Sequence, residues 1–163
     1  MNLRRLEQKD APNMLEWMHD NDVVKYMNND FASFTIESCL GFIEASYHDD
    51  ENVHLAIVNS EDEYMGTVSL KHFKHHSAEF AIAIRSVAMG KGFSQYAMKE
   101  IIKVGFDFYC LNSIYWCVNP NNNRAIKFYK NNGYRAIPVE KLTVDTVYSD
   151  KQIRDFLWFQ IFE

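Results

Sequence analysis

The feature that most constrains this chain is an apolar segment that runs directly into a glycine-containing turn. Residues 78–84 have the composition of a buried strand, and residues 89–94, Met-Gly-Lys-Gly-Phe-Ser, open a segment with helical spacing of apolar residues. Glycine lets a backbone approach a ligand closely, and the first turn of a helix offers unpaired N–H groups. The sequence therefore predicts a strand, a turn and a helix with an anion site at the turn, although glycine can also have a purely steric role there.

A second motif lies 30 residues beyond Gly92 and indicates a short helix. Asn122 suits the N-cap, Gly133 suits the position after the last turn, and the residues between them fit about three turns. Asn122 and Tyr129 are seven residues apart, so we expect their side chains on one face. Because a helix of this length is marginal alone, it must pack against the rest of the fold.

Together the two motifs resemble those of the GNAT superfamily of N-acetyltransferases, most closely the branch of ribosomal-protein N-terminal acetylases (RimJ/RimL-like). The family's pyrophosphate loop, Gln/Arg-x-x-Gly-x-Gly/Ala, falls on Met89, Gly92 and Ser94. Its second motif, Asn-x-x-Ala-x-x-x-Tyr-x-x-x-Gly-Phe, falls on Asn122, Ala125, Tyr129, Gly133 and Tyr134. Met89 and Ser94 depart from the family pattern, which puts the affinity for the cofactor in doubt.

The order of the predicted elements indicates a single α/β domain over residues 1–163. We expect helices at residues 10–19, 35–47, 93–108 and 122–132, and strands at residues 2–6, 53–58, 64–70, 78–84, 113–118, 135–140 and 156–162. The resemblance implies a mixed, mostly antiparallel central sheet flanked by helices. It also implies that the strands at 78–84 and 113–118 splay apart to form a slot for acetyl-coenzyme A (acetyl-CoA).

Composition limits the possible partners and the compartment. The net charge of −5 argues against a nucleic-acid partner and favours a cationic substrate, and no apolar run reaches the roughly 20 residues that a membrane span needs. The N-terminus lacks the features of a signal peptide. Three cysteines without metal or disulfide spacing fit free thiols, so we expect a cytoplasmic protein. Either a monomer or a homodimer is expected.

The resemblance implies acetyl-CoA as the co-substrate and an amine as the acceptor. Backbone N–H groups of residues 90–94 would hold the pyrophosphate, and the exposed backbone near Ile82 and Ile84 would pair with the pantetheine amides. The predicted cofactor-binding residues are Ile82, Ile84, Met89, Gly90, Lys91, Gly92, Phe93, Ser94, Asn122 and Tyr129.

Two residues are the predicted catalytic groups. Tyr129 matches the family's tyrosine, a candidate general acid for the leaving thiolate, although its ring could simply pack against the sheet. Glu79 shares a strand face with Ala81 and Ala83, which leave room for a ligand, so it is the candidate base; an ordinary solvent-facing glutamate is the alternative. Cys117 occupies a second position where the family often carries a base.

Three histidines, His72, His75 and His76, lie in a predicted loop without the carboxylates or cysteines of a zinc site. We expect no metal there, but imidazole titrates near neutrality, so one of them is an alternative base.

The acceptor is the least constrained part of the prediction. The first helices usually wall this site in the family, so Trp17, Tyr26 and Phe31, together with Glu79, are the predicted substrate-binding residues. Aromatic and acidic side chains suit a primary amine, either a peptide N-terminus or a small molecule; an amino sugar or a polyamine is the alternative. A sensor that binds acyl-CoA without turnover also stays open. An ATP-binding P-loop lacks its Lys-Ser/Thr pair here, and a dinucleotide fold does not fit.

Overall fold

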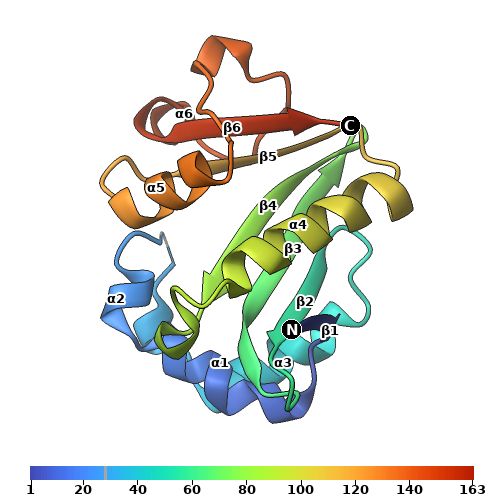
Figure 1. Ribbon diagram of the computed structural model, residues 1–163, viewed down its shortest axis with the longest axis vertical. Helices are drawn as coiled ribbons and strands as arrows, with labels where there is room; N and C mark the ends of the chain where they lie inside the picture. Colours follow the sequence, from blue (N-terminus) through green and yellow to red (C-terminus); the bar gives the residue numbers. More distant parts are fainter. Residues whose placement is uncertain (28) are drawn as a thin grey trace.

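Six strands form one mixed sheet in the order β1-β2-β3-β4-β5-β6, and the computed structural model describes residues 1–27 and 29–163 (Figure 1). Every neighbouring pair is antiparallel except β4 and β5, which are parallel and joined by a helical crossover. The strands are β1 (Asn2–Arg5), β2 (Val53–Val58), β3 (Tyr64–Lys74), β4 (Ser77–Ile84), β5 (Ser113–Val118) and β6 (Leu157–Phe162).

Helices pack on both faces of the sheet. The α-helices are α1 (Ala11–Met18), α2 (Asn21–Val24), α3 (Ile36–Ser46), α4 (Phe93–Lys103), α5 (Asn123–Asn131) and α6 (Asp150–Asp155). Short 3-10 turns lie at Gln8–Asp10, Phe31–Ser33, Ser86–Ala88 and Val139–Lys141, and a π-helical turn at Val104–Phe108 continues α4. One core cluster joins α4 and α5 to the sheet, and a second joins α1 and α3 to β2. In Figure 1, α4 crosses in front of β3 and β4.

The helix ends follow local chemistry. Thr35 and Ser38 form a capping box at the start of α3, and the Asn122 side chain accepts from the Ala125 N–H at 3.1 Å at the start of α5. Gly133 follows α5 with a φ of 85°, a conformation that glycine adopts without strain. These caps confirm the predicted boundaries of both helices within one or two residues.

The sheet opens between its two parallel strands, and this split positions the site. Pairing of β4 with β5 is limited to Ser77 with Ser113, Ala78 with Ile114, and Glu79 with Tyr115. Beyond Glu79, β4 continues to pair with β3, while β5 continues to pair with β6. Figure 1 shows the two halves of the sheet close together near the C-terminus and separating toward α2 and α5. The predicted splay of the two strands is therefore confirmed.

Two sequence-based expectations need correction. The strand expected at residues 135–140 does not form; this segment has one bridge, between Ile137 and Trp158, and then a 3-10 turn. Pro138 lacks an N–H group, so it cannot donate to a ladder. The hairpin of β3 and β4 is also longer than expected, because β3 runs to Lys74 and the chain reverses at His75 and His76, both with positive φ.

Candidate active site

The edge of β4 that faces the split carries unpaired backbone groups. The N–H of Arg85 donates to the carbonyl of Met65 on β3 at 2.9 Å. Because backbone groups alternate along a strand, those of Ile84 and Ile82 face the opposite side, where β5 has already diverged. The split thus presents a strand edge to which an extended amide chain can pair.

A glycine turn lies where β4 leads into α4. Gly90 and Gly92 have φ values of 73° and 87°, and Gly92 is the N-cap of α4. Gly92 has no side chain to accept from the first-turn N–H groups, and the first helical bond runs from the Tyr96 N–H to the Gly92 carbonyl. Buried Phe93 fixes the start of the helix, whereas Lys91 is exposed. The turn therefore offers free N–H groups at the positive end of a helix, as an anion site requires.

Residue Arg124, at the start of α5, bridges the open end of the split. One guanidinium nitrogen lies 3.0 Å from the Met89 sulfur in the glycine turn, and another donates to the carbonyl of Asp22 at 3.2 Å. Asn122 lies two residues earlier and uses its side-chain oxygen as the helix cap. The glycine turn and the start of α5 are thus brought together.

Tyr129 is packed in the aromatic part of the core, with 6% of its surface exposed. Its ring lies 5.3 Å from that of Trp116 and 5.2 Å from that of Phe159. Burial raises the pKa of the Tyr129 phenol above its ordinary value, so the group is protonated at neutral pH. Neighbouring Trp116, on β5, has a buried indole N–H without a hydrogen-bond partner among the described residues.

The Glu79 carboxylate lies at the point where β4 and β5 separate, and only 4% of the residue is exposed. The Tyr148 hydroxyl donates to Glu79 Oε1 at 2.6 Å, and Lys71 Nζ lies 3.8 Å from the same oxygen. Glu79 Oε2 is buried without a hydrogen-bond partner among the described residues, 3.6 Å from His72 Nε2. The alternative of an ordinary solvent-facing glutamate is wrong.

A free thiol also lies near this carboxylate. Cys117 is half-buried on β5, and burial is the main cause that raises its pKa to about 11. A thiol with this pKa is protonated at neutral pH and is a poor base or nucleophile. Burial likewise raises the pKa of the Tyr148 phenol, which keeps it a hydrogen-bond donor toward Glu79.

The predicted acceptor residues do not all face an open surface. Trp17 is 5% exposed, and its indole N–H donates to the Tyr64 hydroxyl at 3.0 Å, so the structure places it in the second core cluster. Tyr26 and Phe31 are half-buried. Two of the nearby acids are engaged: Glu16 pairs with Arg85 at 2.7 Å, and Asp20 accepts a hydrogen bond from the Ser86 hydroxyl.

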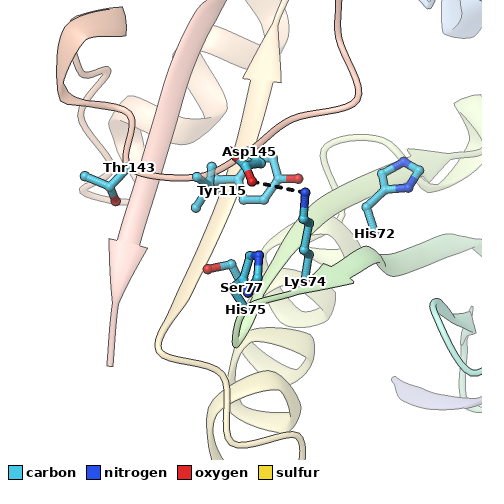
Figure 2. A pocket seen from close by; sticks show the side chains of 8 residues that line it. His72, Lys74, His75, Ser77, Tyr115, Thr143 and Asp145 are labelled. Atoms are coloured by element: carbon cyan, nitrogen blue, oxygen red, sulfur yellow. Dashed lines mark ion pairs between the residues drawn. The ribbon is translucent and has the colours of Figure 1, made fainter.

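A pocket of about 150 Å³ lies on the same face of the sheet as Glu79, between the β3–β4 hairpin and residues 143–145 (Figure 2). Its lining includes Tyr115, which pairs with Glu79 across the strands, and His72, the neighbour of Glu79 Oε2. Within residues 1–27 and 29–163, no group of three or more His, Cys, Asp or Glu is placed to hold a metal ion. None of the helices in those ranges has the length and hydrophobicity needed to cross a bilayer.

Sequence reasoning missed three of these contacts. Tyr148 comes from an irregular segment far along the chain, and no pattern in the sequence links it to Glu79. The ion pair of Lys71 with Glu79 follows from the hairpin register, in which the two residues are opposite each other, and the register needs the turn to be placed correctly. The position of Arg124 depends on how α5 packs beside the split.

A mixed sheet that opens between two parallel strands, with a glycine turn at the open end, is the architecture of transferases that use acyl-CoA. Comparison with known proteins names the family. Residues 1–135 match the family model described as "Acetyltransferase (GNAT) domain", so the chain belongs to the GNAT acetyltransferase family. It is an acetyl-CoA-dependent N-acetyltransferase of that family.

Two curated proteins and one solved structure show the range of relatives. The chain is 24% identical to acetyltransferase PseH of Campylobacter jejuni over 140 residues, 86% of either chain. It is 30% identical to the uncharacterized N-acetyltransferase p20 of Bacillus licheniformis over 134 residues, 78% of this chain and 74% of p20. The spermidine N-acetyltransferase of Vibrio cholerae, solved with CoA and spermine, superposes with a TM-score of 0.79 at 22% identity, covering 99% of this chain and 94% of that one.

Proposed function

We propose that the enzyme transfers an acetyl group from acetyl-CoA to a primary amine by direct attack in a ternary complex, with Glu79 as the general base. The main support for this proposal is the Glu79 carboxylate. It is buried where β4 and β5 separate, and one of its oxygens has no hydrogen-bond partner among the described residues. An ammonium group must lose a proton before it attacks, because a lysine-like amine has a pKa of about 10. His72, 3.6 Å from that oxygen and partly exposed, gives the proton a way to solvent.

The cofactor would lie along the open edge of β4. Ile82 and Ile84 present backbone groups to the pantetheine, and the N–H groups of Gly90 to Ser94 hold the pyrophosphate. Lys91 and Arg124 add positive charge at the same end. Met89 and Phe93 shape the turn, and Asn122 caps the start of α5.

Tyr129 is the proposed general acid for the leaving thiolate. Its raised pKa fits a group that must be protonated before it donates. The phenol ring packs against Trp116 and Phe159 on the two strands beyond the split, which fixes the direction of its hydroxyl. The packing role and the catalytic role are therefore compatible.

Several classes of molecule could supply the primary amine that accepts the acetyl group. The peptide N-terminus rests on the resemblance to the RimJ/RimL-like branch, and an amino sugar or a polyamine is the alternative; the name of the Vibrio cholerae relative indicates a polyamine for that protein. Tyr26 and Phe31 remain candidates for its contact surface, whereas the burial of Trp17 favours a supporting role. A non-catalytic acyl-CoA sensor is less favoured, because both proposed catalytic residues are present and buried in the fold.

Residues 1–163 act as one unit in this proposal, because β6, which lies beyond residue 135, completes the sheet beside β5. A cytoplasmic location is supported by three free cysteines. A monomer and a homodimer are both compatible with the site as proposed.

The test combines titration with acetyl-CoA and a free-thiol release assay over a panel of amines. Glu79→Gln should keep acetyl-CoA binding and lower kcat by about a hundredfold or more, and Tyr129→Phe by about tenfold to a thousandfold, as for other general bases and acids. Tyr134→Phe removes the hydroxyl of a second tyrosine that also packs against Trp116. It is the matched control and should leave kcat unchanged. Binding without thiol release from any amine would favour the sensor, and no binding would refute the cofactor site.

A further inference from the structure

We propose that the acceptor amine carries an anionic group, a phosphate or carboxylate, which binds in the pocket between the β3–β4 hairpin and residues 143–145. This inference rests on the proposed function of Glu79 and names the class of its substrate. The pocket has a volume of about 150 Å³, which suits one such group rather than a whole substrate. Figure 2 shows its labelled side chains around the space beside β5.

The lining of the pocket is rich in hydrogen-bond donors. Its polar side chains are His72, Lys74, His75, Ser77, Tyr115, Thr143 and Asp145. Two imidazoles, an ammonium and a phenol can all donate to an oxyanion, and Asp145 is the single carboxylate of the set. The Tyr115 phenol is protonated at neutral pH, because burial is the main cause that raises its pKa.

The charge around Glu79 disfavours a polyamine. Lys71 already lies 3.8 Å from Glu79, and Lys74 lies 3.0 Å from Asp145, so each nearby carboxylate has a cation beside it. A second ammonium on the acceptor would meet Lys74, His72 and His75 without a free carboxylate in the pocket. An anion there can accept hydrogen bonds from the two imidazoles and would share Lys74 with Asp145, so the site selects by both attraction and repulsion.

The spacing fits a molecule about the length of a sugar ring. The pocket extends from His72 and Tyr115, the direct neighbours of Glu79, to Ser77, which lies two residues along β4 from the base. Two residues of strand span about 7 Å. A phosphorylated or acidic amino sugar spans the distance from the base to the far end of the pocket at Ser77.

The experiment compares matched acceptors in the free-thiol release assay with acetyl-CoA. Glucosamine is the reference without an anionic group, glucosamine 6-phosphate and muramic acid separate phosphate from carboxylate, and spermidine is the polycation. We expect kcat/KM for one anionic sugar to exceed that for glucosamine by about tenfold or more, the size of one charge-assisted hydrogen bond. The advantage should shrink as salt is raised.

Two surface variants test the pocket directly. Lys74→Gln should raise KM for the favoured anionic sugar by roughly threefold to tenfold and leave KM for glucosamine unchanged. Asp145→Asn, which releases Lys74 from its partner, should lower the same KM. Both side chains are more than half exposed, so the fold should tolerate either change.

Each outcome decides between the two proposals. Equal kcat/KM for glucosamine and its anionic analogues, a preference for spermidine, or equal effects of Lys74→Gln on all acceptors would overturn the anionic acceptor while acetyl transfer stands. Bound acetyl-CoA without thiol release from any of the four amines would count against the proposed function and remove the acceptor class with it.

Discussion

The Tyr148 hydroxyl donates to Glu79 Oε1 at 2.6 Å, across 69 positions of sequence. The phenol ring packs against two other rings, 5.5 Å from Trp158 and 6.0 Å from Phe156. Glu79 itself lies on a paired strand, so the hydrogen bond fixes the remaining freedom of its carboxylate. One oxygen is thereby occupied and the other is directed away, toward His72. Tyr148 is a positioning residue for the proposed base.

Removing this hydroxyl should slow turnover without weakening the binding of acetyl-CoA. Tyr148→Phe keeps the ring packing and loses a hydrogen bond to a charged group, typically worth about 1.5–3 kcal/mol. We expect kcat to fall about tenfold and KM for acetyl-CoA to stay unchanged, measured by thiol release with the best acceptor of the panel.

A double-mutant cycle separates positioning from a general loss of structure. In a Glu79→Gln background, Tyr148→Phe should have little further effect, because the carboxylate that it orients is gone. Tyr109→Phe, which changes a phenol packed on Phe73, is the control and should leave kcat unchanged. Independent, additive losses from Tyr148→Phe and Glu79→Gln would contradict the positioning role.

The glycine turn should respond to charge more than to bulk. Gly92→Asp adds a carboxylate at the proposed pyrophosphate site and should weaken acetyl-CoA binding by more than about tenfold, measured by calorimetric titration. Gly92→Ala adds a Cβ whose nearest neighbour, Cε of Met1, is 3.7 Å away, and should weaken binding less.

A second glycine supplies the matched control for backbone strain. Gly133→Ala forces alanine into the same left-handed conformation, at about 1 kcal/mol, with open space for the Cβ. It should lower the melting temperature by an amount similar to Gly92→Ala and leave acetyl-CoA affinity unchanged. If Gly92→Asp binds acetyl-CoA as the wild type does, the turn is not the pyrophosphate site.

The three cysteines should react with an alkylating reagent at very different rates. Exposed Cys110 should react first, and buried Cys39 only on unfolding. The Cys117 pKa of about 11 leaves a thiolate fraction at pH 8 that is about a hundredfold below that of a thiol with the ordinary value of 9.0. Its rate should rise with pH up to about 11, as measured by mass spectrometry of the modified peptides. Labelling of Cys117 as fast as Cys110 at pH 8 would show that its surroundings are more open than the structure has them.

Much of this fold was accessible to sequence reasoning, because the periodic apolar residues and the caps are local signals. The strands at Val53–Val58 and Ser113–Val118 and the cap at Asn122 came from such signals. The strand expected near Ile137 failed because its residue types fit a strand while Pro138 and the tertiary setting do not. Local propensity gives way there to the long loop that carries Tyr148.

The site was less predictable than the fold, for a physical reason. Glu79 could be chosen from strand alternation, but its burial depends on Tyr148, Lys71 and the loop that covers it. These are long-range contacts, and no spacing rule reports them. The same limit applies to Trp17, because an aromatic side chain suits the wall of a substrate site and a core equally well. Only the hydrogen bond from its indole N–H to the Tyr64 hydroxyl places it in the core.

Acidification should destabilise the fold through His54. Its Nδ1 lies 2.7 Å from Ser69 Oγ and its ring packs on Phe42 at 4.8 Å. Burial is the main cause that lowers the pKa of this imidazole below its ordinary value of 6.5; Lys71 and His72 act in the same direction, and Asp49 opposes them. The unfolded chain therefore binds the proton more readily than the folded chain. The contribution of neutral His54 to the free energy of unfolding is fully present above pH 6.5 and is lost as the pH falls below that value.

Thermal unfolding at pH 7.5 and pH 5.5 measures this effect. We expect the melting temperature of the wild type to fall more between pH 7.5 and pH 5.5 than that of His54→Gln. Glutamine does not titrate at this position but can still hydrogen-bond to Ser69. His48→Gln removes an exposed imidazole that is 3.9 Å from Glu44 and serves as the control, with the same pH dependence as the wild type. If His54→Gln and the wild type lose the same melting temperature, the proton that opposes folding binds elsewhere.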